Sequence, residues 1–171
     1  PKALEGHDLM GQARTGTGKT AAFGIPLLEK FGSGERQKEP AALILVPTRE
    51  LAVQVRDELT KLAGRSKVTT VAVYGGKPIR GQIEHLRRGA EIIVGTPGRV
   101  IDLIDRRALN LVALKCVVLD EADRMLDIGF RPDIEKILRR CPHARQTLLL
   151  SATIPPPVKR LAERYMIEPE M

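Results

Sequence analysis

The sequence has few aromatic residues. It contains no tryptophan, and phenylalanine and tyrosine together supply 3% of its 171 residues. Proteins that recognise nucleic acids through the bases often stack those bases on exposed rings, and such a surface needs more rings than this. The composition therefore disfavours base stacking and leaves contacts to a sugar–phosphate backbone as the alternative.

Cysteine and long hydrophobic segments are also scarce. Cys116 and Cys141 are too few for a disulfide framework, and this cysteine use predicts a reduced, cytoplasmic location. No apolar run approaches the roughly 18–20 residues of a membrane span. We expect Cys116 to be a core residue. We expect Cys141, Pro142 and His143 to form an ordinary loop, because no second ligand pair lies at metal-binding spacing.

Acidic residues are outnumbered by basic ones. The 21 Asp and Glu residues stand against 28 Lys and Arg residues, which gives a formal charge of +7. This excess suits solubility alone, and it equally suits a polyanionic partner, most simply a nucleic acid. With 43% hydrophobic and 29% charged residues, the chain has the composition of one globular domain.

Short apolar runs recur along the chain and predict its strands. Several are apolar at every position, as expected for strands buried on both faces of a parallel sheet. The runs are residues 8–10, 43–46, 68–73, 92–94, 116–119 and 147–150. Helical patterns separate them, as where Leu51, Val55, Leu59 and Leu62 repeat at helical spacing. This alternation predicts a doubly wound α/β domain, whose ligands bind beyond the carboxyl ends of the strands.

Glycine and proline mark the expected ends of helices. Thr96-Pro97 has the pattern of a helix cap followed by proline in the first turn. Residues 32–40 are expected to form a solvated loop. Helices are expected to stop at Gly32, Gly64, Gly89 and Gly129.

The first predicted strand is followed by a phosphate-binding pattern. The segment consists of Ala13, Arg14, Thr15, Gly16, Thr17, Gly18, Lys19 and Thr20. Its glycines allow consecutive backbone N–H groups to surround phosphate oxygens, and the helix that follows adds its positive amino end. Lys19 is expected to reach the β- and γ-phosphates, and the Thr20 hydroxyl to bind Mg²⁺. A plain glycine-rich turn is the alternative. Ala13 stands where this pattern usually has its first glycine.

Acidic residues follow the predicted strand at 116–119. Asp120 at the tip of a buried strand is the second Mg²⁺ anchor that a phosphate loop requires. Glu121 beside it is expected to accept a proton from the attacking water. The alternative is an acidic helix start that complements the helix dipole.

Six motifs occur in one order between residues 13 and 153. They are residues 13–20, Pro47-Thr48-Arg49-Glu50-Leu51-Ala52, Gly75-Gly76, Thr96-Pro97-Gly98-Arg99, Asp120-Glu121-Ala122-Asp123 and Ser151-Ala152-Thr153. This order strongly resembles the first RecA-like domain of DEAD-box ATP-dependent RNA helicases. The tetrapeptide at 120–123 favours this family over related helicases that act on DNA.

The resemblance implies roles for further residues. A track for single-stranded RNA would be formed by Thr48, Arg49, Gly76, Thr96 and Arg99. Hydroxyl, guanidinium and glycine backbone groups contact phosphate and sugar without reading sequence. The alternatives are that the two threonines only cap helices and that the two arginines are solvated charges.

A coupling role is implied for the Ser151-Ala152-Thr153 turn. It would bond back towards Asp123 and link the nucleotide state to the grip on RNA. A simple polar turn between a strand and a helix is the alternative for Ser151 and Thr153.

The resemblance also implies ATP and Mg²⁺ as cofactors and a second RecA-like domain as a partner. That domain would supply arginines to the γ-phosphate, and the family's adenine-reading segment precedes the phosphate loop. We expect both to lie outside these 171 residues, which would form a single ATP-binding domain. One hypothesis is a catalytic half that works once joined to the second domain. The other is a binding module that alone holds nucleotide and RNA weakly, with negligible turnover.

Overall fold

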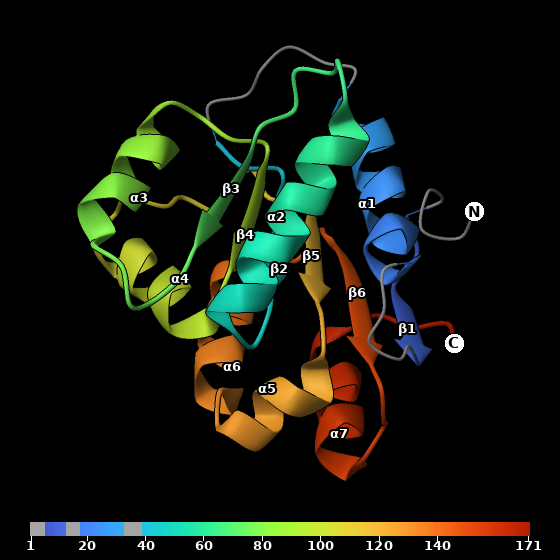
Figure 1. Cartoon of the computed structure of the whole chain (residues 1–171). Coiled ribbons are helices and arrows are strands. Elements are labelled where there is room, and N and C mark those ends of the chain that lie inside the picture. Colours follow the sequence, from blue (N-terminus) through green and yellow to red (C-terminus); the bar gives the residue numbers. More distant parts are fainter. Residues whose placement is uncertain (1–5, 13–17, 33–38) are drawn as a thin grey trace.

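The computed structural model describes residues 6–12, 18–32 and 39–171. Its centre is a six-stranded, entirely parallel sheet with the strand order β1-β6-β5-β2-β4-β3 (Figure 1). The strands are β1 (Leu9–Gln12), β2 (Ala42–Leu45), β3 (Thr70–Val73), β4 (Ile92–Gly95), β5 (Cys116–Leu119) and β6 (Gln146–Ser151). All six strands were expected from the apolar runs, with shifts at their ends.

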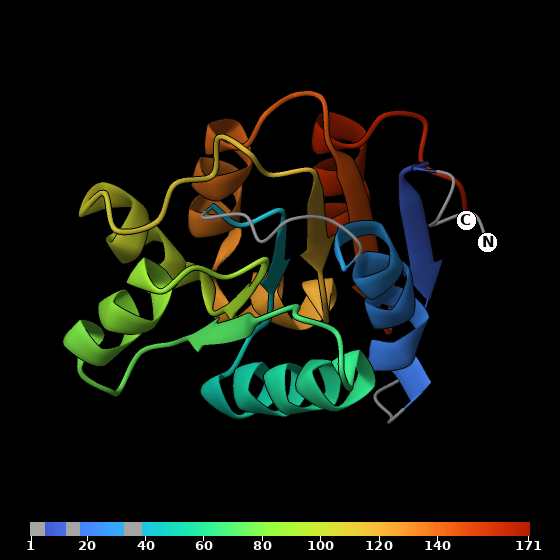
Figure 2. The ribbon, with the colours of Figure 1, turned by 90° about the horizontal axis from the view of Figure 1, so that it is seen from above.

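Helices cover both faces of the sheet, as expected for a doubly wound α/β domain (Figure 2). One face packs against α1 (Gly18–Phe31) and α2 (Arg49–Ala63). The other face packs against the remaining helices. These are α3 (Ile79–Arg87), α4 (Pro97–Asp105), α5 (Ala122–Ile128), α6 (Arg131–Arg140) and α7 (Pro156–Tyr165).

The central strands are apolar throughout because they lie between two hydrophobic cores. In β2, Leu43 and Leu45 face the core beneath α4–α7, whereas Ala42 and Ile44 face the core beneath α1 and α2. All four residues are buried. Successive side chains of a strand point to opposite faces, so each strand contributes to both cores.

The first strand differs from its predicted bounds at Asp8. This residue precedes β1, and its buried carboxylate accepts hydrogen bonds from the backbone N–H groups of Thr147 (2.8 Å) and Ile167 (2.7 Å). The residue thus ties the start of β6 and the carboxyl-terminal segment to the sheet edge, a contact between distant segments that apolar patterning does not reveal.

Glycine ends the helices as predicted. Gly64 and Gly129 are the C-caps of α2 and α5, and both have positive φ angles, 55° and 104°. Gly32 directly follows α1, and Gly89 follows the C-cap of α3. Glycine reaches this backbone region without the steric cost that a Cβ would bring.

Both cysteines, Cys116 and Cys141, are free and buried, as was expected for Cys116. Burial raises the pKa of the Cys116 thiol to about 12 and that of Cys141 to about 11, so both stay protonated at neutral pH. None of the helices in the described part of the chain is long and apolar enough to cross a membrane.

Candidate functional site

The predicted site residues gather at the carboxyl edge of the sheet. Thr48 follows β2, Thr96 follows β4, Asp120 follows β5, and Ser151 ends β6. Parallel strands place all these positions at one edge. Lys19 and Thr20 lie in the first turn of α1. The remaining phosphate-loop positions 13–17 lie outside the described residues.

The centre of the site is a buried ion pair between Lys19 and Asp120. The Lys19 Nζ atom lies 2.5 Å from Asp120 Oδ1, and the two side chains are 8% and 3% exposed. Burial raises the pKa of the Asp120 carboxyl above its usual range, although Lys19 acts in the opposite direction. Apart from this pair, neither atom has a hydrogen-bond partner among the described residues. Each is therefore placed to take a ligand.

Glu121 is held in an unusual backbone conformation. Its φ and ψ angles are 54° and 51°, in the left-handed region, and it directly precedes α5. This region is costly for a residue with a Cβ and is found where surrounding structure enforces it. The turn leaves the Glu121 side chain largely buried, 3.4 Å from the Arg124 guanidinium. Neither this turn nor the Arg124 contact was predicted from the sequence.

A cavity of about 360 Å³ joins these groups. It is lined by Lys19, Thr20, Thr48, Glu50, Leu51, Gln54, Asp120, Glu121 and Arg124. The volume lies within the range of small-ligand sites. The pocket thus brings the expected phosphate-binding and acidic residues together. Glu50, Gln54 and Arg124 were not assigned roles from the sequence.

Two residues of this cavity offer oxygen atoms of the kind that bind magnesium. No cluster of three or more His, Cys, Asp or Glu residues suited to a metal exists in the described ranges. Magnesium does not require one, because it commonly binds one or two carboxylates, water and substrate phosphates. The buried Asp120 carboxylate and the Thr20 hydroxyl line the same cavity. This donor set is consistent with Mg²⁺ held jointly with a nucleotide.

The predicted bonds between Asp123 and the 151–153 turn are present. Asp123 Oδ2 accepts from the Thr153 N–H (3.1 Å) and hydroxyl (2.8 Å), while the Asp123 N–H donates to Ser151 Oγ (3.1 Å). Partial burial alone would raise the pKa of Asp123. Hydrogen bonds from Thr153, Arg124 and Ser151 outweigh it and hold the pKa below its usual range.

On the other side of the edge, Arg49 lies against a glycine turn. The Thr48 hydroxyl accepts a hydrogen bond from the Leu51 N–H (3.2 Å) and so caps α2. Arg49 is half exposed and 3.6 Å from Glu50. A Cβ on Gly76, whose φ is 86°, would stand 3.0 Å from the Arg49 guanidinium. The absence of a side chain there permits the close approach of the two segments.

Thr96 and Arg99 differ from the alternatives considered for them. Thr96 is the N-cap of α4 by position, but its side chain makes no capping hydrogen bond. Arg99 is not a free solvated charge, because its side chain is 14% exposed. Its guanidinium donates to the Lys77 carbonyl (3.1 Å) and to Gln82 Oε1 (3.0 Å).

Gln82 is the main site residue missed from the sequence. Its buried amide accepts from the Tyr74 N–H (3.2 Å) and donates to the Tyr74 carbonyl (2.9 Å), besides accepting from Arg99. It therefore joins the end of β3, the 75–78 turn and α4. A signal was available, since Gln82 stands beside the apolar positions Ile79, Ile83 and Leu86 of an amphipathic helix.

Comparisons with known proteins agree with these features. The sequence model described as DEAD/DEAH box helicase matches residues 1–161. The chain is 53% identical over 171 residues to "ATP-dependent RNA helicase CshA" of Listeria monocytogenes and 55% identical over 171 residues to "DEAD-box ATP-dependent RNA helicase CshA" of Streptococcus pneumoniae. These alignments cover 100% and 99% of this chain but 32% of each relative. The chain thus spans about a third of the length of these curated relatives.

Solved structures show the same fold. A DEAD box protein from Methanococcus jannaschii superposes with a TM-score of 0.93 at 46% identity, covering 99% of this chain and 46% of that one. A hypothetical ATP-dependent RNA helicase from Sulfolobus tokodaii gives a TM-score of 0.89 at 36% identity, covering 98% and 48%. The RecA-like fold expected from the motifs is thereby confirmed.

Proposed function

Because the chain belongs to the DEAD/DEAH box helicase family, we propose that it forms the ATP- and RNA-binding domain of an ATP-dependent RNA helicase. The observation that carries this proposal is the cavity that gathers Lys19, Thr20, Asp120 and Glu121. These are the cation, the hydroxyl and the two acids that hydrolysis of a nucleoside triphosphate requires.

The nucleotide side acts through local charges. The positive amino end of α1 attracts the phosphates, and Lys19 neutralises the β- and γ-phosphate charge. Lys19 is paired with Asp120 in this structure. Binding of a Mg-nucleotide would replace this ion pair, because Lys19 would then hold phosphate and Asp120 would help to hold the metal ion.

Thr20 and Asp120 are the residues that would hold Mg²⁺. When bound, the ion neutralises the charge that develops on the phosphate oxygens. Glu121 accepts a proton from the water that attacks the γ-phosphorus, while the bond from that phosphorus to the ADP oxygen breaks. The left-handed turn at Glu121 supports this role, because it ends the strand direction at a residue that lines the same cavity as Asp120.

The RNA side contacts the sugar–phosphate backbone of the RNA. Arg49, Arg99, the 75–78 turn and the hydroxyls of Thr48 and Thr96 form one wall for a single strand. The close packing of Arg49 on Gly76 and the bonds of Arg99 to Lys77 and Gln82 support a preformed wall. The few aromatic residues fit a grip that does not depend on base stacking.

The hydrogen bonds between Asp123 and the 151–153 turn couple the two sides. Asp123 lies in the first turn of α5, two residues after Glu121, so movement at the nucleotide shifts the turn that follows β6. A second RecA-like domain closes over the γ-phosphate and completes the RNA clamp. Joined to it, this domain couples ATP hydrolysis to the unwinding or remodelling of RNA duplexes. The cytoplasmic location expected from cysteine use stays a prediction.

The experiment compares this chain alone with a chimera in which it replaces the matching third of Listeria CshA. ATP hydrolysis is measured across a titration with single-stranded RNA, beside a strand-displacement assay. We expect RNA-stimulated hydrolysis and unwinding from the chimera. The chain alone should bind both ligands weakly and turn ATP over negligibly. A chimera that hydrolyses no ATP, with folding confirmed, would contradict the proposal. Strong RNA stimulation of the chain alone would contradict the need for a second domain.

A further inference from the structure

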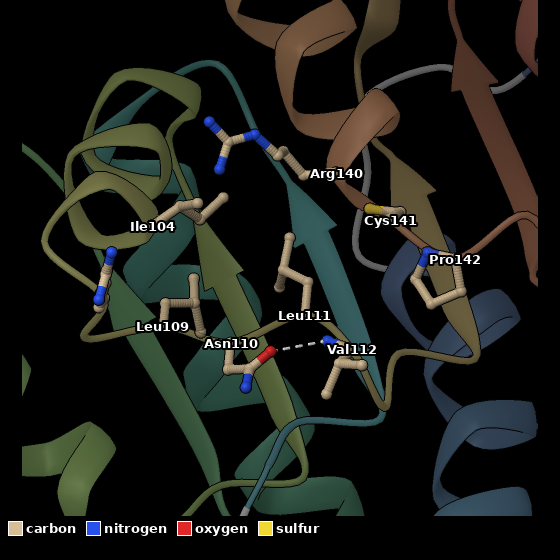
Figure 3. A pocket seen from close by; sticks show the side chains of 9 residues that line it. Ile104, Leu109, Asn110, Leu111, Val112, Arg140, Cys141 and Pro142 are labelled. Atoms are coloured by element: carbon tan, nitrogen blue, oxygen red, sulfur yellow. Dashed lines mark hydrogen bonds between the residues drawn. The ribbon is translucent and has the colours of Figure 1, made fainter.

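A second hollow lies at the opposite edge of the sheet and belongs to neither side of the proposed site. It has a volume of about 570 Å³ and is formed by the segment before β5, the end of α4 and the end of α6. Figure 3 shows the side chains of Ile104, Leu109 and Leu111 reaching into the space between α4 and the segment that carries Cys141 and Pro142. Residues 109–112 precede β5, so this is the amino edge of the strands.

A neighbouring hollow continues this surface. It has a volume of about 380 Å³ and shares Arg107, Leu109 and Asn110 with the first. The loop that separates the two is fixed in shape, because the Asn110 side chain accepts from the Val112 N–H (3.0 Å) and donates to Glu39 (3.2 Å). We call the two hollows together the amino-edge groove.

The walls of the groove are apolar, whereas its rim is cationic. Val112, which lines the first hollow, is 68% exposed. Arg107 lies on both hollows, and no acid in the described ranges forms an ion pair with it. Arg140 is 4.0 Å from Asp105, a weak contact between two half-exposed side chains. Among the residues that the structure describes, Glu39 is the one acid that lines either hollow, and its carboxylate is already bonded to Asn110.

We propose that the amino-edge groove binds a short acidic peptide of a partner protein, with an apolar side chain as its anchor. Apolar walls give the anchor a dry contact, and Arg107 and Arg140 attract flanking carboxylates. The two hollows on either side of one loop suit an extended segment that touches both. Nucleic acid fits less well, because its phosphates would lie against Ile104, Leu111 and Val112.

Position makes this site independent of the proposed enzymatic function. The nucleotide and RNA residues follow the strands, whereas the groove residues precede β5, β6 and β2. A partner held here leaves the carboxyl edge open to ATP, RNA and a second domain. The groove is therefore suited to bringing the domain to other proteins without blocking its chemistry.

The test measures the binding of a fluorescein-labelled peptide, Asp-Leu-Glu-Leu-Asp, to the 171-residue chain by fluorescence anisotropy. In one control peptide lysine replaces each acidic residue, and in the other serine replaces each leucine. The acidic peptide should bind, more weakly at high salt, and the lysine peptide should not. Serine for leucine should weaken binding by about tenfold, the effect of losing buried apolar area. Mg-ATP should not displace the peptide.

Protein variants locate the contact. Arg107→Glu should weaken binding of the acidic peptide by about three- to tenfold and improve binding of the lysine peptide. This is expected when an attraction between exposed opposite charges becomes a repulsion between like charges. Arg160→Glu changes net charge equally, on the exposed face of α7, and should leave binding unchanged. Val112→Asp provides a second variant at an exposed position if Arg107→Glu unfolds.

Several results would overturn the proposal. The first is failure of the acidic peptide to bind, the second is equal binding of the acidic and lysine peptides, and the third is displacement of the acidic peptide by Mg-ATP. Two further results would show that the groove serves RNA binding or self-association, and they would equally contradict the peptide proposal. One is an RNA affinity that falls in Arg107→Glu as much as in Arg49→Ala. The other is self-association of the chain, by sedimentation, that Arg107→Glu abolishes.

Discussion

The nucleotide side and the RNA side of the carboxyl edge are built in different ways. On the nucleotide side, Lys19 and Asp120 are almost fully buried, and their interaction is charge on charge. On the RNA side, Arg49 is half exposed, and Arg99 donates to the Lys77 backbone carbonyl and the Gln82 amide, with the Asp102 carboxylate 4.0 Å away. Electrostatic effects grow as water is excluded. Single changes should therefore cost far more on the nucleotide side than on the RNA side.

The largest effect is expected for Glu121→Gln. The carboxamide keeps the shape of the side chain but removes the base, so ATP turnover in the chimera should fall by about 10²–10⁴-fold while nucleotide affinity is retained. Hydrolysis is measured at saturating ATP and RNA. Glu50→Gln is the matched control, because Glu50 lines the same cavity but is largely exposed. Turnover at the parental rate in Glu121→Gln would refute its role as the base.

Lys19→Ala should weaken Mg-nucleotide binding by about 10- to 100-fold, as expected for a lost charge-assisted contact in a buried site. Calorimetric titration of the chain measures it, with the exposed Lys61→Ala as control. The variant also leaves the Asp120 carboxylate buried without its cation. Burial already raises the pKa of Asp120, so the loss of stability should be greatest at high pH and shrink as the carboxyl is protonated. Equal affinity in variant and parent would contradict the assignment.

Gln82→Leu tests whether the RNA wall is preformed by hydrogen bonds. It leaves both Tyr74 backbone groups and Arg99 without this partner, so the chain should lose about 1–3 kcal/mol of stability. RNA affinity should fall by about tenfold if Arg99 and the 75–78 turn lose their positions. Nucleotide affinity should not change. Gln82→Glu still accepts hydrogen bonds from the Tyr74 N–H and from Arg99 but cannot donate to the Tyr74 carbonyl. Its RNA affinity should therefore lie between that of the parent and that of Gln82→Leu. Gln54→Ala, an exposed amide, is the control. A stability loss without any change in RNA binding would make Gln82 purely structural.

Arg49→Ala sharpens the contrast between the two arginines. RNA affinity should fall similarly for all sequences, and the salt dependence should flatten by up to about 0.7 log unit per lost phosphate contact. Stability should hardly change, because the side chain pairs with exposed Glu50. Arg99→Ala should flatten the salt dependence and also lower the melting temperature, because Arg99 bonds Lys77 and Gln82. Arg56→Ala, on the same helix as Arg49, is the control. Unchanged RNA affinity and an unchanged salt slope in both variants would contradict the proposed phosphate contacts.

More of the nucleotide side than of the RNA side could be predicted from the sequence. Asp120, Glu121 and Lys19 were found because each stands directly beside a predicted strand end or in a known phosphate-binding pattern. Apolar runs likewise predicted all six strands. Two kinds of feature escaped. One is backbone geometry, such as the left-handed Glu121. The other is polar contact between distant segments, such as Gln82 with Tyr74 and Arg99, or Asp8 with Thr147 and Ile167. Hydrophobic periodicity reports the burial of a segment and carries no information about such pairings.

The smallest effect is expected at the connection between the two sides. In Asp123→Asn, one carboxylate oxygen becomes an NH₂ group, which accepts no hydrogen bond. The bonds from Thr153 and from the Arg124 N–H cannot then both be kept, so about 1 kcal/mol of stability should be lost at pH 7. Hydrogen bonds hold the folded-state pKa of Asp123 below its usual value. A lowered pKa stabilises the fold above the unfolded pKa of about 3.9, and this contribution is lost as pH falls through the folded value.

The deficit of Asp123→Asn relative to the parent should therefore be constant from about pH 7 to pH 5 and shrink below about pH 4. Thermal unfolding across pH measures it, and Asp127→Asn, an exposed acid on the same helix, should show little deficit at any pH. In the chimera, the same variant should reduce the stimulation of ATP hydrolysis by RNA more than it reduces binding of either ligand, because the coupling contact alone is weakened. A deficit that persists undiminished at pH 3 would show that the carboxylate charge contributes nothing to the turn. Unchanged stimulation would show that the two sides communicate by another route.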